Sequence, residues 1–189
     1  MEWSHKQSLV LITGLVILIF ICGCTSAPEY QSARSPSAGY GSPGYLEKIS
    51  FGDVIEMIED DPEYLALNGS RLCQVTGSGV DLSGNATSWM LGFCNENGNQ
   101  LLVCDMHGWR QMKWAGVLPD DEIDLSQIVS PEELYARAAG PLAAAMKASG
   151  VEEGNLSLSG REYTVTLISD GKLNMLYFDA FTGEEVSST

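Results

Sequence analysis

The segment REYTVTLISDGKLNMLYFD, residues 161–179, carries the clearest fold signal in this chain. Two runs of alternating apolar and polar residues flank the dipeptide Asp170-Gly171, which favours a two-residue turn between antiparallel strands. This register predicts a β-hairpin, because it places every second side chain of both runs on the same face. The expected core face is Tyr163, Val165, Leu167, Leu176 and Phe178.

A second segment, WMLGFCNENGNQLLVCDM at residues 89–106, has the same pattern around the turn dipeptide Asn97-Gly98. When the two segments are aligned with a constant shift of 74 residues, Trp89 aligns with Tyr163. The apolar face of one hairpin then coincides with the apolar face of the other. Each hairpin follows a helical segment and a short strand-like piece, and we interpret the match as an internal duplication. The expected core face of this hairpin is Trp89, Leu91, Phe93, Leu102, Cys104 and Met106.

The segment SPEELYARAAGPLAAAMKASG, residues 130–150, predicts the longer helix. Ser130 suits the N-cap, the proline after it suits the first helical turn, and Gly150 suits the C-terminal cap. Gly140-Pro141 lies within the pattern and predicts a kink. A weaker helix is expected from Phe51 to Asp60, where apolar residues recur at helical spacing.

These elements predict an α+β protein with an antiparallel sheet and helices packed on one face of it. Two related helix–strand–hairpin units are expected, over residues 45–114 and 115–189. The junction between them is expected near residues 115–130.

The N-terminus has a separate character. Its apolar run, Leu9 to Gly23, has about the length of a signal-peptide core and is short for a membrane span, which needs ~20 apolar residues. The residues Ile21-Cys22-Gly23-Cys24 resemble the lipobox of bacterial and archaeal lipoproteins. This resemblance implies a signal peptide over residues 1–23 and a lipid on Cys24. Two alternatives stay open: an uncleaved anchor helix from about Ser8 to Cys24, and a cytosolic protein that buries this segment.

Residues 25–44, TSAPEYQSARSPSAGYGSPG, predict a flexible tether, because they lack apolar periodicity and are rich in turn-forming residues. Twenty such residues span a mean distance of ~25 Å. With the lipidated Cys24 they form a module over residues 24–44. The expected location is the outer side of the cell membrane, in the periplasm or at the cell exterior, held there by the lipid or the apolar segment.

The net charge of the chain is −15. A nucleic-acid partner is not expected, because phosphate binding needs a basic surface. The acidic runs at residues 56–63 and 120–124 favour solubility, with divalent-cation binding as the alternative. Neither run has the ligand spacing of an EF-hand loop.

Three cysteines follow the tether: Cys73, Cys94 and Cys104. The strand register puts Cys104 on the core face and Cys94 on the opposite face, so no bond between those two is expected. Cys73 can pair with either of them in an exported protein. The alternative is three separate thiols.

The end of the chain resembles a PepSY domain, in which a hairpin closes on an Asp-x-x-Thr-Gly-Glu-Val pattern. The matching residues are Asp179, Thr182, Gly183, Glu184 and Val186, with Glu185 inserted before the valine. The resemblance covers residues ~130–187 and extends by pattern alone to ~46–110. PepSY-like domains occur in propeptides of thermolysin-type metallopeptidases and in many exported proteins. The resemblance therefore implies an exported peptidase, or another envelope protein, as the partner.

No catalytic residue, cofactor or metal ligand is assigned from the sequence, and no enzyme is expected. His107 is the single histidine after the tether, and strand parity separates it from Cys104. Soft-metal or small-ligand binding is the alternative function, because thiol and thioether groups suit copper(I). The residues that suggest it are Met90, Cys94, Cys104, Met106, His107 and Met112.

The segment WRQMKWAGVLP contains Trp109 and Trp114. We expect it to pack across the sheet or between the two units, and the alternative is an exposed protein interface. The functional hypothesis is a non-enzymatic, lipid-anchored binding or regulatory module outside the membrane that modulates an exported peptidase.

Overall fold

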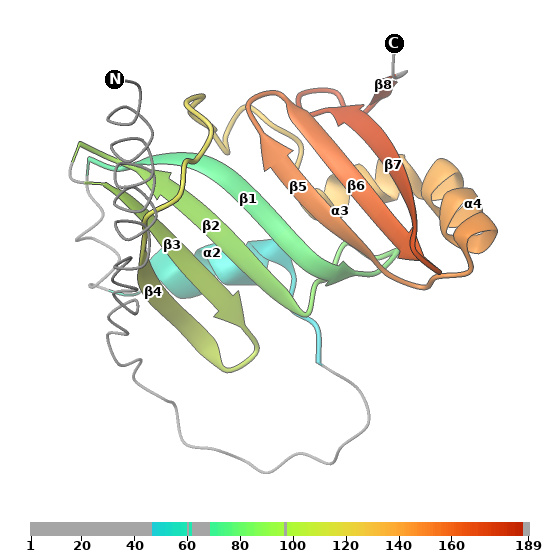
Figure 1. Ribbon diagram of the computed structural model, residues 1–189, viewed down its shortest axis with the longest axis horizontal. Coiled ribbons are helices and arrows are strands. Elements are labelled where there is room, and N and C mark those ends of the chain that lie inside the picture. The colour runs from blue at the N-terminus through green and yellow to red at the C-terminus, as the bar shows by residue number, and fades with distance from the viewer. Residues whose placement is uncertain (1–46, 60, 62–68, 97, 187–189) are drawn as a thin grey trace, which may run out of the picture.

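The computed structural model describes residues 47–59, 61, 69–96 and 98–186. Eight strands form one sheet, and every neighbouring pair is antiparallel (Figure 1). The predicted α+β class is confirmed, with more strand than helix. The expected leader, lipidated Cys24 and tether lie outside the described residues. In the part of the chain that is described, no helix is long and apolar enough to cross a membrane.

The elements occur in a repeated order along the chain. The helices are α2 (Phe51–Glu59), α3 (Pro131–Arg137) and α4 (Ala139–Ser149). The strands are β1 (Arg71–Val80), β2 (Ser88–Cys94), β3 (Asn99–Asp105), β4 (Gly108–Trp114), β5 (Gly154–Ser159), β6 (Glu162–Ser169), β7 (Lys172–Asp179) and β8 (Glu185–Val186). A helical segment followed by four strands thus appears twice. This is the order that a duplication predicts; the common origin of the halves and their division into separate units stay predictions.

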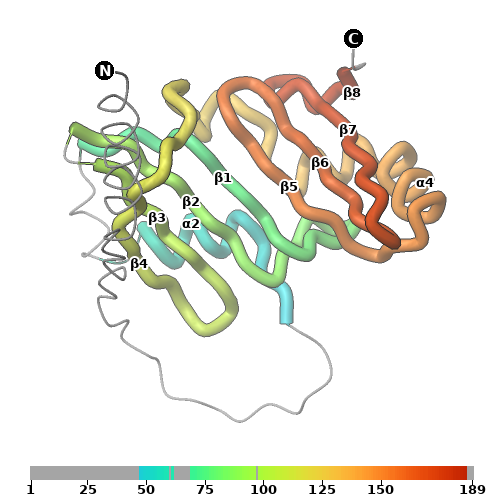
Figure 2. The backbone as a smooth tube through the Cα atoms, in the orientation of Figure 1, coloured from blue at the N-terminus to red at the C-terminus, as the bar shows by residue number. Residues whose placement is uncertain are grey.

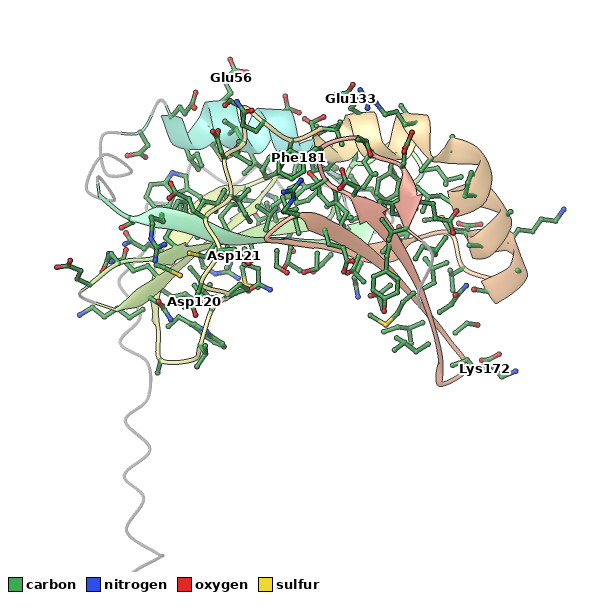
Figure 3. All side chains as sticks on the ribbon, turned by 90° about the horizontal axis from the view of Figure 1, so that it is seen from above. Glu56, Asp120, Asp121, Glu133, Lys172 and Phe181 are labelled. Carbon is green, nitrogen blue, oxygen red and sulfur yellow. The ribbon has the colours of Figure 1, made fainter. Side chains whose placement is uncertain are left out.

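The strand order in space is β4-β3-β2-β1-β5-β6-β7-β8, so the two sets of four strands meet where β1 pairs with β5 (Figure 2). Val75 lies opposite Leu158 in this pairing, and Gly77 lies opposite Leu156. Residues of α2, α3, α4 and both sets of strands belong to one buried apolar cluster, the main core. Figure 3 shows α2 and α3 above the same side of the sheet.

Trp89 is the largest fully buried side chain in the main core. Its indole Nε1 donates a hydrogen bond to the Ile49 carbonyl at 3.0 Å, and its ring meets the Phe51 ring edge-on at 5.1 Å. Gly77 pairs with Trp89 across β1 and β2, and a Cβ at that position would lie 2.7 Å from the indole. Only glycine therefore fits opposite this ring.

The hairpin of β6 and β7 follows its prediction. Ser169 pairs with Lys172, and Asp170 and Gly171 form a two-residue turn with φ of 48° and 74°. Both angles are positive, as the expected turn type requires. The predicted core face is buried, with Leu176 half-buried at its edge.

The hairpin of β2 and β3 departs from its prediction at both ends. Its two strands are joined by four residues, 95–98, and not by the expected two-residue turn, whose Asn97 lies outside the described residues. Trp89, Leu91, Phe93, Leu102 and Cys104 are buried as expected. Met106 is 43% exposed, so its assignment to the core face was wrong. The reason is that β3 ends at Asp105, which pairs with Gly108 across a further tight turn.

The helix expected over residues 130–150 is two helices. The Ser130 hydroxyl caps α3 by accepting a bond from the Glu133 N–H at 3.2 Å, and Gly150 ends α4 with φ of 68°. The break falls at Ala138, one turn before Pro141. A proline has no N–H and its ring clashes with the carbonyl four residues earlier, here that of Arg137, so α3 stops at that residue.

The segment between β4 and α3 joins the two faces of the sheet. Leu118 packs with Cys73 and Leu101 on the face away from the helices. Ile123 lies in the main core, and its N–H donates to the Leu72 carbonyl at 2.7 Å. Residues 115–130, here called the connecting segment, therefore pass around the end of β1 from one face to the other.

Two buried tyrosines give a matched test of how the connecting segment is fixed. The Tyr163 hydroxyl donates to the Val129 carbonyl at 2.8 Å, whereas the Tyr135 hydroxyl has no partner among the described residues. We expect Tyr163→Phe to lower the free energy of unfolding by about 1–2 kcal/mol, because it leaves a buried carbonyl unpaired. Tyr135→Phe is expected to leave that free energy unchanged or raise it. Urea denaturation measures both, and equal losses in the two variants would contradict the assignment.

Candidate binding pocket

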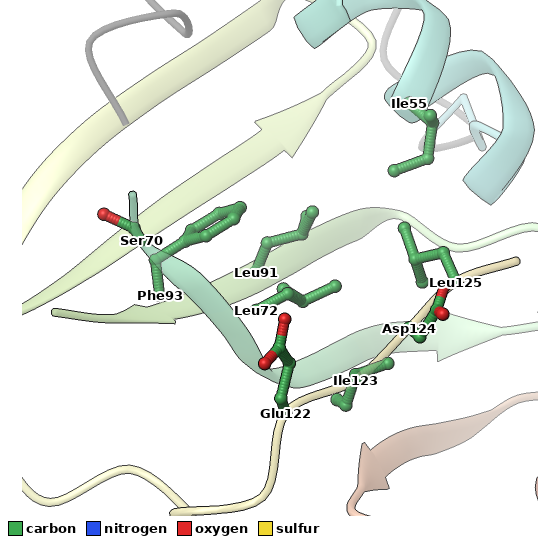
Figure 4. A pocket seen from close by; sticks show the side chains of 9 residues that line it. All are labelled: Ile55, Ser70, Leu72, Leu91, Phe93, Glu122, Ile123, Asp124 and Leu125. Carbon is green, nitrogen blue, oxygen red and sulfur yellow. The ribbon is translucent and has the colours of Figure 1, made fainter. Parts of the chain in front are cut away.

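A pocket of about 630 Å³ lies between α2, the sheet and the connecting segment, at the end where β1 begins and β2 ends (Figure 4). Leu72, Leu91 and Phe93 project into it from the two strands, and Ile55 faces them from α2. Because strand side chains alternate between faces, these apolar residues are the continuation of the main core. The floor of the pocket is therefore apolar.

Acidic residues of the connecting segment form the rim. In Figure 4 the Glu122 carboxylate is directed toward the pocket, and Asp124 lies beside the Leu125 side chain. Asp124 Oδ1 accepts hydrogen bonds from the Ser126 hydroxyl at 2.7 Å and from the Ser126 N–H at 3.0 Å. These bonds hold the pKa of Asp124 below its ordinary value. Since a carboxyl with a lowered pKa loses its charge only at more acid pH, Asp124 stays anionic at neutral pH.

A second pocket of about 580 Å³ lies on the other side of the connecting segment. Arg71, Cys94 and Asp120 line it, and the Arg71 Nη1 donates to the Asp120 carbonyl at 3.3 Å. Leu118 closes one wall. The connecting segment thus separates a pocket with an apolar floor and an acidic rim from a second pocket that contains a thiol.

The cysteines lie on the faces that the strand register predicts. Cys104 is buried in the main core, whereas Cys94 packs against a second cluster that contains Cys73. All three are thiols in this structure. Of the two pairings that the sequence leaves open, Cys73 with Cys94 is the one whose members share a face. The bond itself stays a prediction.

The six residues that suggest a soft-metal site do not form one site. Cys104 lies in the main core, and Met106 and His107 lie in the exposed turn between β3 and β4. The other three, Met90, Cys94 and Met112, pack against the second cluster with Cys73. Within residues 47–59, 61, 69–96 and 98–186, no three His, Cys, Asp or Glu side chains are grouped so that they could hold a metal ion.

Trp109 and Trp114 belong to β4, an edge strand that the sequence analysis did not predict. Trp109 is half-buried against the main core, and Trp114 at the end of the strand is 44% exposed. The first part of the segment is thus an edge strand of the sheet, whereas Leu118 near its end packs on the sheet face with Cys73 and Leu101. A protein interface at Trp114 stays a prediction.

The PepSY-like motif closes the turn after β7. Asp179 Oδ1 accepts bonds from the N–H groups of Phe181 and Thr182, both at 2.9 Å, and these bonds lower the Asp179 pKa. The Gly183 N–H donates to the Asp179 carbonyl at 2.8 Å. The Thr182 carbonyl accepts from the Arg137 guanidinium at 2.6 Å. These contacts dock the turn on α3, so the geometry gives the motif a structural role.

No family model matches this chain, and no curated protein matches it. Among solved structures it is similar to a protein from Clostridium difficile 630 described as a "putative lipoprotein". The identity is 13% and the TM-score 0.47, over 74% of this chain and 91% of the other. The PepSY resemblance stays a prediction from the motif.

Two glycines test the structural role of the motif. Gly183 has φ of 71°, and a Cβ there would lie 3.2 Å from the Arg137 Cδ. Gly140, within α4, has open space around its Cβ position. We expect Gly183→Ala to lower the free energy of unfolding by about 1–2 kcal/mol through backbone strain. Gly140→Ala is expected to raise it by about 0.5–1 kcal/mol. Chemical denaturation measures both variants, and a neutral Gly183→Ala would contradict the role.

Proposed function

We propose that this chain is a non-enzymatic, lipid-anchored binding module that works at the outer face of the cell membrane. Residues Ile21 to Cys24 carry the proposed location, because a branched apolar residue and a small residue precede a cysteine at the end of a short apolar run. The turn-rich tether that follows gives the folded part the reach to meet a partner away from the lipid headgroups.

The pocket between α2 and the connecting segment supports the binding role. Its apolar floor favours an apolar side chain, and the Glu122 and Asp124 carboxylates favour a positive charge beside it. A basic, apolar segment of an exported protein has both features. The PepSY-like motif makes an exported peptidase the first partner to test.

Cys104 and His107, which could serve as nucleophile and base, are poorly placed for a nucleophilic mechanism. Burial raises the pKa of the Cys104 thiol to about 12, so it stays protonated at neutral pH. His107 lies in an exposed turn, where Asp105 Oδ1 accepts its backbone N–H at 2.8 Å. These placements support a binding role over covalent catalysis.

The anchor is tested with two cysteine variants of the full-length chain expressed in bacteria. Intact mass and detergent extraction should show a wild-type protein that begins at Cys24, carries acyl chains and partitions with the membrane. Cys24→Ser is expected to abolish acylation, because the hydroxyl cannot replace the thiol. Cys22→Ser is the matched control and should be acylated. A wild-type chain that keeps residues 1–23 and carries no lipid would contradict the proposal.

The pocket is tested with two short peptides on the mature protein, residues 24–189. Methyl NMR shifts of Ile55, Leu72 and Leu91 should report binding of acetyl-Ile-Arg-Phe-amide and much weaker binding of acetyl-Ile-Glu-Phe-amide. The double variant Glu122→Gln/Asp124→Asn should lower the affinity for the basic peptide by about three- to ten-fold, because two rim charges are removed. Higher salt should also lower this affinity.

The matched control is Glu152→Gln/Glu185→Gln, which removes the same charge from exposed positions outside the pocket. It should bind the basic peptide as the wild type does. Equal binding of the two peptides, or equal losses in the two double variants, would contradict the pocket assignment.

A further inference from the structure

Cys73 occupies a β-bulge at the start of β1. Leu72 pairs with Phe93 and Gln74 pairs with Gly92, so Cys73 is the extra residue between two ladder pairs. Leu72 lies in the main core, whereas Cys73 belongs to the second cluster on the opposite face. The bulge therefore directs a buried thiol away from the helices.

Cys94 meets this thiol from the neighbouring strand. It ends β2 opposite Arg71, two residues before Cys73 in β1, and it packs on the second cluster. The two thiols lie close enough to interact electrostatically. The Cys73 thiol donates to the Arg71 carbonyl at 3.5 Å, and the Cys94 thiol donates to the Pro119 carbonyl at 3.7 Å. Diagonal neighbours on regular antiparallel strands lie about 7–8 Å apart, which is too far for a disulfide, so the pairing depends on the bulge at Cys73 and on a backbone shift there.

The two thiols differ in access. Cys73 is fully buried, whereas Cys94 is half-buried and lines the second pocket, of about 580 Å³. Arg71 and Asp120 line the same pocket. A reagent in the pocket therefore reaches Cys94 first.

We propose that Cys73 and Cys94 form an intrachain disulfide by exchange with a small or protein disulfide outside the cytoplasm, and that Cys104 stays the free thiol. The Cys94 thiolate attacks one sulfur of the reagent, which breaks the reagent's S–S bond and releases one thiolate. The Cys73 thiolate then attacks the Cys94 sulfur and expels the second thiolate. The protein loses two protons and two electrons, and the reagent disulfide is reduced to two thiols.

The surroundings of Cys73 determine how lasting the bond is. Burial, and then the neighbouring Cys94 thiol, raise the pKa of the Cys73 thiol. A thiol with a raised pKa is rarely ionised and is a poor leaving group, so both closure and reopening are slow at neutral pH. The bond therefore acts as a lasting link between β1 and β2, beside the wall that the two pockets share. Closure should become faster as the pH rises, because more of the Cys73 thiol is then ionised.

The test uses the mature chain with Cys24→Ser, which leaves three cysteines. After incubation with oxidised glutathione, the protein is unfolded in guanidinium, alkylated and weighed. We expect a loss of about 2 Da before alkylation, one alkylated cysteine, and a peptide that joins Cys73 to Cys94. The melting temperature should rise by roughly 5–10 °C and return when a reductant is added.

Three variants separate the outcomes. Cys104→Ala should still close the bond and leave no alkylated cysteine. In Cys73→Ser the reaction should stop after glutathione has been attached to Cys94. In Cys94→Ser neither an intrachain disulfide nor a glutathione adduct should form at Cys73. Three alkylated thiols in the oxidised protein, a bond to Cys104, or a glutathione adduct that never closes would overturn the proposal. A reduced pair that binds one copper(I) ion and resists oxidation would also overturn it, in favour of a soft-metal site.

Discussion

The antiparallel pairing of β1 with β5 is the constraint on which the rest of the structure depends. It makes two sets of four strands into one sheet, and side chains from both sets enter one core. A charged contact reinforces it, because the Glu132 carboxylate of α3 accepts the N–H groups of Phe51 and Gly52 at the start of α2. A carboxylate at a helix N-terminus satisfies free N–H donors and the helix dipole together. Each half thus supplies part of the other's local structure.

Figure 3 shows α2 and α3 above one side of the sheet, so side chains on the opposite face need cover from other segments. The connecting segment meets part of this need, because Leu118 packs on that face before the chain passes to Ile123 in the main core. This passage creates both pockets. The apolar floor and acidic rim are the basis for the proposed binding of a basic, apolar segment, and the proposed Cys73–Cys94 disulfide would link β1 to β2 close to the same wall. Both proposals thus concern sites beside one segment.

The local signals of the fold could be predicted from sequence, because each depends on a few adjacent residues. Asp170-Gly171 form the turn of the β6–β7 hairpin, and Ser130 caps the N-terminus of α3. The strand β4 was missed because its turn lacks a strong turn dipeptide and because polar and apolar residues are mixed on both of its faces. The candidate pocket was missed for another reason: its walls come from segments far apart in the chain, and only the long-range strand pairing brings them together. The bulge that turns Cys73 toward Cys94 also has no sequence signature.

The most direct test of the shared sheet follows its two halves during unfolding. The described tryptophans, at positions 89, 109 and 114, lie in the first half, and the described tyrosines, at 135, 163 and 177, lie in the second. Urea unfolding of the mature chain is therefore followed by tryptophan fluorescence and by ¹⁹F NMR of fluorotyrosine in the same samples. If β1 and β5 hold one cooperative unit, the two transitions have the same midpoint and slope. Two separate transitions, with one half folded while the other is unfolded, would contradict this account.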